Sequence, residues 1–270
     1  MSLLLHISDT HFGTELPTVV QALLALTRER QPDVLVFSGD ITQRARASEF
    51  ATARRFCDAL GIAPMLVLPG NHDIPLLDVF SRVARPYRNY LDAFGPRLEP
   101  VMETDDFLVV GVNTTRPYRH KNGEVSAEQA RRVARQLHGA RASQLRIVVT
   151  HQPAVVTRPE DQHDRLKGAD PALELWAQAG ADLVLGGHIH LPYVVELATP
   201  GGAGPRAMWC VQAGTAVSSR IRHGTHNSVN LIHWRPPHAG QARVCRVERC
   251  DYLPEHGWFG TAGIQDLALA

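Results

Sequence analysis

The sequence has few of the features that mark secreted, membrane-bound or nucleic-acid-binding proteins. Its 270 residues include only four cysteines, and lysine plus arginine number 28 against 27 for aspartate plus glutamate. This balance predicts no broad nucleic-acid or membrane-surface footprint, because neither charge dominates. The first apolar stretch, "LLLHIS", is too short for a signal-peptide core or a membrane span. We therefore expect a cytoplasmic protein with neither a membrane nor a nucleic-acid duplex as partner.

The cysteines form no C-x-x-C pair and have no histidines at zinc-finger spacing. We interpret them as small, reduced core residues; they are Cys57, Cys210, Cys245 and Cys250. With 44% hydrophobic and 20% charged residues, the composition is that of an ordinary globular protein. The length suits one large α/β domain, so we expect a single domain over residues 1–270.

Short apolar runs alternate with helical patterns through the first two thirds of the chain. Strands are predicted near 3–8, 33–39, 65–70, 107–113, 145–151 and 181–188, and helices near 16–30, 47–61, 126–139 and 170–180. This alternation predicts stacked α/β layers. Residues 191–250 instead predict mostly antiparallel strands, near 192–198, 207–213, 228–234 and 242–249.

Two further segments fit this alternation poorly. Residues 74–105 follow a polar motif directly, and we expect them to form a cap-like wall beside it, with Arg82, Arg85 and Arg88 on a solvated helix face. Residues 251–270 form an apolar tail that packs either on its own domain or on a second subunit.

Histidine is the unusually frequent residue, at 14, and several histidines stand where predicted strands end. Polar groups follow five of these strands: Asp9 and His11 in "SDTH", Asp40 in "SGDIT", Asn71, His72 and Asp73 in "GNHD", His151 in "VVTHQP", and His188 and His190 in "LGGHIH". Each alone is explained by a helix cap, a turn or a buried hydrogen bond. Open α/β sheets, however, gather ligand sites at the carboxyl ends of their strands. Because polar groups follow five strands in this way, we predict that they form one shared ligand site.

The side chains in these clusters suit metal ions. Seven of them are candidate ligands, which is too many for one tetrahedral ion: Asp9, His11, Asp40, Asn71, His151, His188 and His190. Two ions that share a bridging carboxylate fit this number better, and such a pair, about 3.5–4 Å apart, is suited to in-line displacement at phosphorus. Nitrogen and oxygen ligands without thiolate favour Mn, Fe, Zn or Co.

The ordered series "DTH", "GD", "GNHD", "H" and "GHIH", spanning residues 9–190, closely resembles the calcineurin-like metallophosphoesterases, and most of all their compact bacterial cyclic-nucleotide phosphodiesterase branch. The resemblance implies a four-layer α-β-β-α sandwich of two mixed sheets flanked by helices. It implies a reaction in which a metal-bridging hydroxide attacks phosphorus. It also implies a ligand set: Asp9, His11 and His190 for the first ion, Asn71, His151 and His188 for the second, and Asp40 between them.

The resemblance further implies roles for the rest of "GNHD". His72 contacts the phosphate or the leaving oxygen as general acid or charge stabiliser. Asp73 orients the His72 ring, and Gly70 allows the backbone to turn. The residue types also make chemical sense without the resemblance. The negative charge of a phosphodiester repels an attacking hydroxide, and two metal ions both neutralise that charge and supply hydroxide at neutral pH. No serine or cysteine stands in a nucleophile elbow, so we expect no covalent intermediate.

The metal ligands predict the reaction better than the substrate. By resemblance, the leading hypothesis is a phosphodiesterase of small diesters, foremost 3',5'-cyclic nucleotides. Glycerophosphodiesters, phosphomonoesters or a mixture are alternatives, and a non-catalytic scaffold with the same fold is an alternative of another class. Arg44 and Arg46 either contact a substrate phosphate or begin a solvent-facing helix. Similar proteins are often dimers, which makes a homodimer a further expectation.

Overall fold

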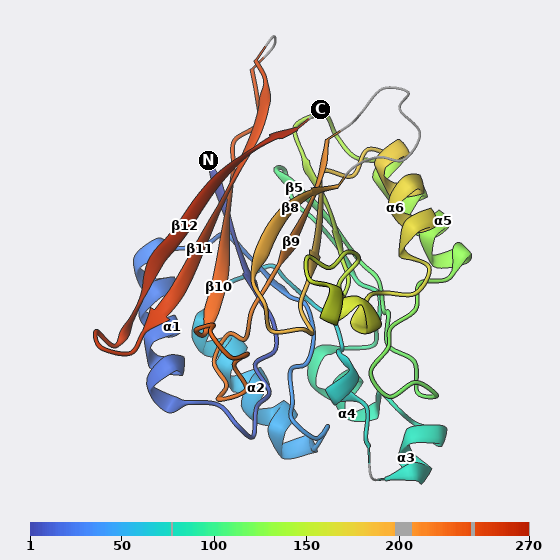
Figure 1. The fold of residues 1–270 in the computed structure, drawn as a ribbon, viewed down its shortest axis with the longest axis vertical. Helices are drawn as coiled ribbons and strands as arrows, with labels where there is room; N and C mark the ends of the chain where they lie inside the picture. Colours follow the sequence, from blue (N-terminus) through green and yellow to red (C-terminus); the bar gives the residue numbers. More distant parts are fainter. Residues whose placement is uncertain (77, 198–206, 239–240, 270) are drawn as a thin grey trace.

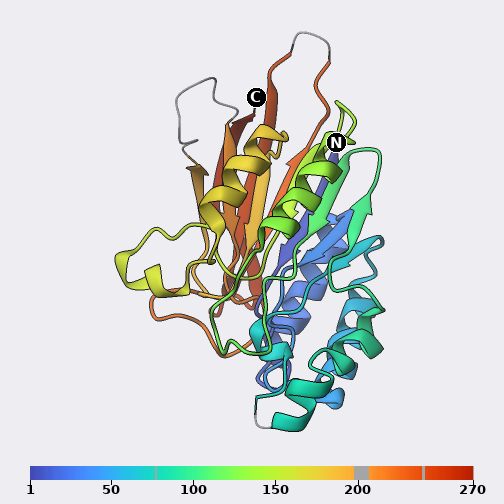
Figure 2. The same cartoon turned by 90° about the vertical axis from the view of Figure 1, so that its right-hand side faces the viewer.

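A computed structural model describes residues 1–76, 78–197, 207–238 and 241–269 and contains two six-stranded sheets stacked between helices (Figure 1 and Figure 2). The first sheet has the order β12-β11-β10-β1-β2-β3. Its strands are β1 (Ser2–Ile7), β2 (Val34–Phe37), β3 (Met65–Val67), β10 (Ser228–Trp234), β11 (Arg243–Leu253) and β12 (Trp258–Leu269).

The second sheet has the order β4-β5-β6-β7-β9-β8. Its strands are β4 (Val101–Glu103), β5 (Phe107–Gly111), β6 (Leu145–Val149), β7 (Leu183–Gly186), β8 (Tyr193–Leu197) and β9 (Met208–Gln212). The α-helices are α1 (Pro17–Arg30), α2 (Ala47–Leu60), α3 (Val79–Ala84), α4 (Arg88–Phe94), α5 (Ala127–His138) and α6 (Ala169–Gln178). Two 3-10 turns, η1 (Asn71–Asp73) and η2 (Pro159–Asp164), stand in loops beyond strand ends.

Three apolar layers hold the sandwich together. Along β1, Leu3 and Leu5 face the core under α1 and α2, whereas Leu4 faces the second sheet, as the two-residue period of a strand requires. A second outer core lies between α5, α6 and the second sheet, and Trp176 of α6 is fully buried in it. Helix, sheet, sheet and helix therefore follow in four layers, and the predicted sandwich is confirmed.

Local sequence signals place the helix ends. Pro17 opens α1, where its missing N–H is not needed, and α2 ends before Gly61, which adopts the left-handed conformation at φ 68°. Ser126 precedes α5 and exchanges hydrogen bonds with Gln129, forming a capping box. The predicted helices thus begin and end within a few residues of the observed ones.

Parallel pairing brings the polar clusters to one edge of the sandwich. β1, β2 and β3 are parallel neighbours in the first sheet, and β5, β6 and β7 are parallel neighbours in the second. The predicted C-terminal strands all form, although residue 198 lies outside the described residues. β9 departs from the antiparallel pattern, because it pairs in parallel with β7 and antiparallel with β8.

Both segments that fit the alternation poorly have regular structure. Residues 258–269 of the expected tail form β12, which pairs antiparallel with β11 at the edge of the first sheet. Arg82, Arg85 and Arg88 do not share a helix face as predicted. Instead, α3 ends at Ala84 and α4 begins at Arg88, because Pro86 disfavours helical backbone at the residue before it.

Two predictions from composition concern the whole chain. All four cysteines are free and buried, as expected of core residues. In the described ranges no helix combines the length and the apolar content needed to cross a bilayer.

Candidate metal centre

Seven side chains from both sheets meet at the edge where the parallel strands end. They form two overlapping groups in which the possible ligand atoms lie within 4.8 Å of one another: Asp9, His11, Asp40 and His190 in the first, and Asp40, His151 and His188 in the second. Asn71 joins the second group, with its Oδ1 3.2 Å from Nε2 of His151. The structure thus brings together every residue that the sequence singled out as a metal ligand.

In the first group, the possible ligand atoms of three side chains lie close together. Oδ1 of Asp9 lies 3.2 Å from Nε2 of His190 and 3.8 Å from Nε2 of His11, and these two nitrogens are 3.1 Å apart. Oδ1 of Asp9 is buried and accepts no hydrogen bond. A buried carboxylate oxygen without a donor calls for a cation, so this group fits a metal ion.

Asp40 belongs to both groups through different oxygens. Its Oδ2 lies 3.7 Å from Nε2 of His11, while its Oδ1 lies 3.2 Å from Nε2 of His151. Burial alone would raise the pKa of Asp40, but the neighbouring imidazoles, foremost that of His151, hold this pKa well below its usual range. The carboxylate is therefore ionised and arranged as a bridge between two sites.

Backbone carbonyls fix the imidazoles of His151 and His190. Nδ1 of His151 donates to the carbonyl of Ser38 over 2.8 Å, and Nδ1 of His190 donates to the carbonyl of Arg220. Because a carbonyl only accepts, each ring carries a proton on Nδ1 and turns Nε2 toward the cluster, and Nε2 is the nitrogen that binds a metal ion when the ring is neutral. Such outer contacts are the usual means of orienting histidine ligands.

His188 is held from the other side of its ring. Its Nε2 lies 3.5 Å from Oδ1 of Asp164, at the end of η2, while its Nδ1 is buried without a hydrogen-bond partner. The unpartnered nitrogen of His188 suits a metal ion as well.

His11, in the first group, is neutral. Burial lowers the pKa of the His11 imidazole to about 3, and the neutral imidazole is the form that binds metal ions.

The backbone is strained where these side chains branch. Seven non-glycine residues in the described ranges have positive φ, and five of them are candidate ligands: Asp9 (54°), His11 (42°), Asp40 (49°), His188 (76°) and His190 (55°). Such conformations cost on the order of 1–3 kcal/mol each and concentrate at functional sites. The fold therefore maintains this arrangement against local preference.

Asp73 does not orient the His72 ring, so that prediction is wrong. Its carboxylate instead accepts hydrogen bonds from the backbone N–H groups of Gly70 (2.8 Å), Ile41 (3.0 Å) and Thr42 (2.8 Å). The side chain turns back toward the loop after β2, where those amides point. It thereby ties the loop that carries Asp40 to the turn that carries Asn71 and His72.

The ring of His72 has another support. Its Nδ1 donates to the carbonyl of Gln43 over 3.1 Å, which leaves Nε2 free of that bond. Its centroid lies 4.8 Å from that of His11, at nearly right angles. The imidazole that the sequence predicted to face the substrate therefore stands beside the first group.

Gly70 is needed for a reason other than the predicted turn. Its φ of −100° is available to any residue, but a Cβ atom there would overlap the backbone nitrogen and Oδ1 of Asp40. The glycine therefore allows two loops to approach closely.

Replacing Gly70 with alanine is expected to lower the free energy of unfolding by about 1–3 kcal/mol, because the added methyl group forces the two loops apart. Urea unfolding measures this loss. Gly263→Ala is the control, since a Cβ at Gly263 meets no atom within 4 Å. Equal midpoints for Gly70→Ala and wild type would refute the close-approach argument.

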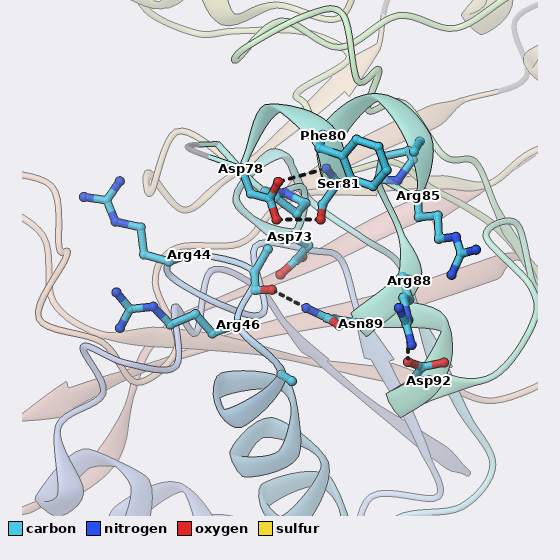
Figure 3. Close-up of a pocket in the computed structure, with 15 residues that line it drawn as sticks. Arg44, Arg46, Asp73, Asp78, Phe80, Ser81, Arg85, Arg88, Asn89 and Asp92 are labelled. Atoms are coloured by element: carbon cyan, nitrogen blue, oxygen red, sulfur yellow. Dashed lines mark hydrogen bonds and ion pairs between the residues drawn. The ribbon is translucent and has the colours of Figure 1, made fainter.

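A cleft of about 780 Å³ lies beside the "GNHD" turn (Figure 3). Arg44 and Arg46 stand on one side of it, and α3 and α4, with Arg85 and Arg88, stand on the other. Asp73 also lines it, but none of the seven candidate ligands does. The cleft therefore adjoins the "GNHD" turn without being lined by the candidate ligands.

Sequence reasoning missed three residues that contact the site: Gln43, Asp164 and Arg220. Gln43 contacts His72 through its backbone carbonyl, a contact for which a sequence gives no signal. Asp164 and Arg220 stand in loops whose approach to the cluster depends on how the chain packs.

Comparisons with known proteins agree with this geometry. A family model described as calcineurin-like phosphoesterase matches residues 3–192. The glycerophosphodiester phosphodiesterase GpdQ of Enterobacter lignolyticus is 43% identical over 84 residues, which cover 26% of this chain and 29% of that protein. A probable cyclic nucleotide phosphodiesterase of Synechococcus is 24% identical over 176 residues, 64% of each protein. Each match thus spans less than two thirds of the relative.

Solved structures share the fold at low sequence identity. A purple acid phosphatase from yellow lupin (Lupinus luteus) seeds superposes with a TM-score of 0.72 and 11% identity, covering 99% of this chain and 53% of that one. A dimetal phosphatase from Danio rerio has a TM-score of 0.66 and 12% identity, covering 100% and 99%. Because the family match extends over most of its length, the chain belongs to the calcineurin-like phosphoesterases.

Proposed function

We propose that this protein is a dinuclear-metal phosphodiesterase of small diesters, with 3',5'-cyclic nucleotides as its preferred substrates. The observation that carries the proposal is the arrangement of Asp40, whose two oxygens face two different donor groups. A site for one ion would need only one such group. A shared carboxylate between two groups is what a pair of ions requires.

The proposed ligand roles follow the two groups. One ion is held by Asp9, His11 and His190, the other by Asn71, His151 and His188, with Asp40 shared. The donor set of nitrogen and oxygen without sulfur suits Mn, Fe, Zn or Co. When bound, two such ions supply charge neutralisation at the phosphate and hydroxide at neutral pH, since a metal can lower the pKa of water from 15.7 to about 7.

The protein's own part is to orient groups and to move a proton. Carbonyls at Ser38 and Arg220 hold two histidine rings with Nε2 toward the cluster. The carbonyl of Gln43 holds His72 in the same way, so that Nε2 of His72 is the atom available to the phosphate or the leaving oxygen. A proton donated there assists departure of an alkoxide.

The relatives support two substrate classes. The longer match, over 176 residues, is to a probable cyclic nucleotide phosphodiesterase, and the shorter but more identical one is to a glycerophosphodiester phosphodiesterase. Glycerophosphodiesters are therefore the second candidate. The presence of every proposed ligand together with His72 argues against a non-catalytic scaffold.

A substrate panel tests the proposal. Manganese-loaded protein is expected to hydrolyse cyclic AMP or cyclic GMP with a higher kcat/KM than glycerophosphoethanolamine or p-nitrophenyl phosphate, and EDTA is expected to abolish all four activities. A higher kcat/KM for glycerophosphoethanolamine than for the cyclic nucleotides would make glycerophosphodiesters the preferred substrates instead. Protein that holds two metal ions and hydrolyses none of the four would favour the scaffold.

A further inference from the structure

Arg220 lies in the loop between β9 and β10 and reaches the predicted catalytic histidine. Its Nη1 is 3.3 Å from Nε2 of His72, the nitrogen not used by the Gln43 carbonyl. The same Nη1 donates to Oε1 of Gln43 over 2.8 Å. Nη1 also lies 3.5 Å from Nδ1 of His72, so the side chain of the half-buried Arg220 lies against the imidazole ring.

This arginine has no acidic counterpart. Among the described residues no carboxylate lies within ion-pair distance of it, and Nε and Nη2 have no acceptor. Arg222, two residues later, offers the contrast, because its Nη1 lies 2.8 Å and 2.9 Å from the two oxygens of Asp161. Half-buried arginines are ordinarily paired with carboxylates. The charge of Arg220 thus remains available to an external anion.

The backbone of Arg220 is anchored to the same site. Its carbonyl accepts from Nδ1 of His190 and, over 3.1 Å, from the hydroxyl of Thr215. Its amide donates to Oγ of Ser218 over 3.3 Å. The side chain is accordingly positioned beside the cluster by three contacts that do not involve the guanidinium.

We propose that Arg220 binds a non-bridging oxygen of the phosphoryl group beside His72; the inference rests on the proposed function. A planar guanidinium with free N–H groups matches phosphate oxygens in geometry as well as in charge. A cation placed next to two metal sites is unfavourable unless an anion occupies the space between them. A phosphate supplies that anion.

The test is calorimetric titration of inorganic phosphate into protein that carries two manganese ions per chain. Arg220→Gln is expected to weaken phosphate binding about 10- to 100-fold, the range for a lost hydrogen bond to a charged group, with two ions still bound. Arg220→Lys is expected to recover part of the affinity, because it keeps the charge and loses the planar fork. Arg54→Gln is the control, since it removes the same charge from the exposed face of α2.

Wild-type phosphate affinity in Arg220→Gln would overturn the assignment. Loss of metal from both Arg220 variants would also overturn it, since that would assign the side chain a structural role. Thermal unfolding verifies that each variant is folded. Arg220-dependent phosphate binding by a protein that hydrolyses no diester would uphold the anion site and reject the proposed phosphodiesterase, so that the two failures are distinguishable.

Discussion

Replacing Asp40 with alanine is expected to remove both metal ions and all hydrolytic activity together. The substitution deletes the one carboxylate whose oxygens face both donor groups, and it leaves the imidazoles of His11 and His151 without their shared anion. It also removes the acceptor for the backbone N–H of His72, 2.8 Å away. Activity is expected to fall to that of metal-free protein.

Elemental analysis of metal per chain, made alongside the rate measurement, checks this result. Asp40→Asn keeps an oxygen that accepts from the N–H of His72 but loses the negative charge. Metal loss in this variant is therefore due to the lost charge and not to a disturbed loop. Asp58→Ala serves as the control, because that carboxylate is 57% exposed on α2 and pairs with Arg54 on the same helix, away from the cluster. Two ions retained by Asp40→Ala would refute the bridging role.

Replacing His72 with alanine is expected to leave the metal content unchanged and to reduce turnover by about 10²–10⁴-fold, the usual contribution of acid–base assistance. His72 stands beside the first group without belonging to either group. Its ring is held through Nδ1 by Gln43 and contributes no atom to either group, so its loss is expected to spare the proposed ligands.

Two substrates with different leaving groups define the role of His72. Cyclic AMP releases an alkoxide, which needs a proton, whereas bis(p-nitrophenyl) phosphate releases a stable phenolate. A greater loss on cyclic AMP indicates a general acid, and equal losses indicate a contact to the phosphate. Exposed His138, at the end of α5, provides the control variant. Wild-type rates on both substrates would contradict either role.

The sequence predicted the strand ends well because two strong signals coincide there. Apolar runs such as "VLVF" define buried strands, and "GD" or "GNHD" marks the point where each stops. Parallel strands then bring these points together without any knowledge of side-chain contacts. The middle layer was predictable for a related reason, since strands such as β1 and β2 are covered on both faces and therefore consist mostly of apolar residues.

Other features depend on contacts that no local pattern encodes. Asp73 was assigned to its sequence neighbour His72, but its carboxylate accepts from the amide of Gly70 and from two amides about thirty residues away, in the loop after β2. Arg220 follows a strand of the C-terminal part, far from every motif, and reaches His72 only because β9 and β10 lie in different sheets. Gly70 presents a similar case, since its requirement comes from Asp40 and not from its own conformation.

The origin of the ligands in two separate sheets has a consequence for assembly. Asp9, Asp40 and Asn71 come from the first sheet, while His151, His188 and His190 come from the second. Neither sheet alone supplies the complete set of proposed ligands, so a chain in which only one sheet has formed is expected to hold at most part of a two-metal centre. A centre that carries both metal ions is therefore expected only where the two sheets have packed together.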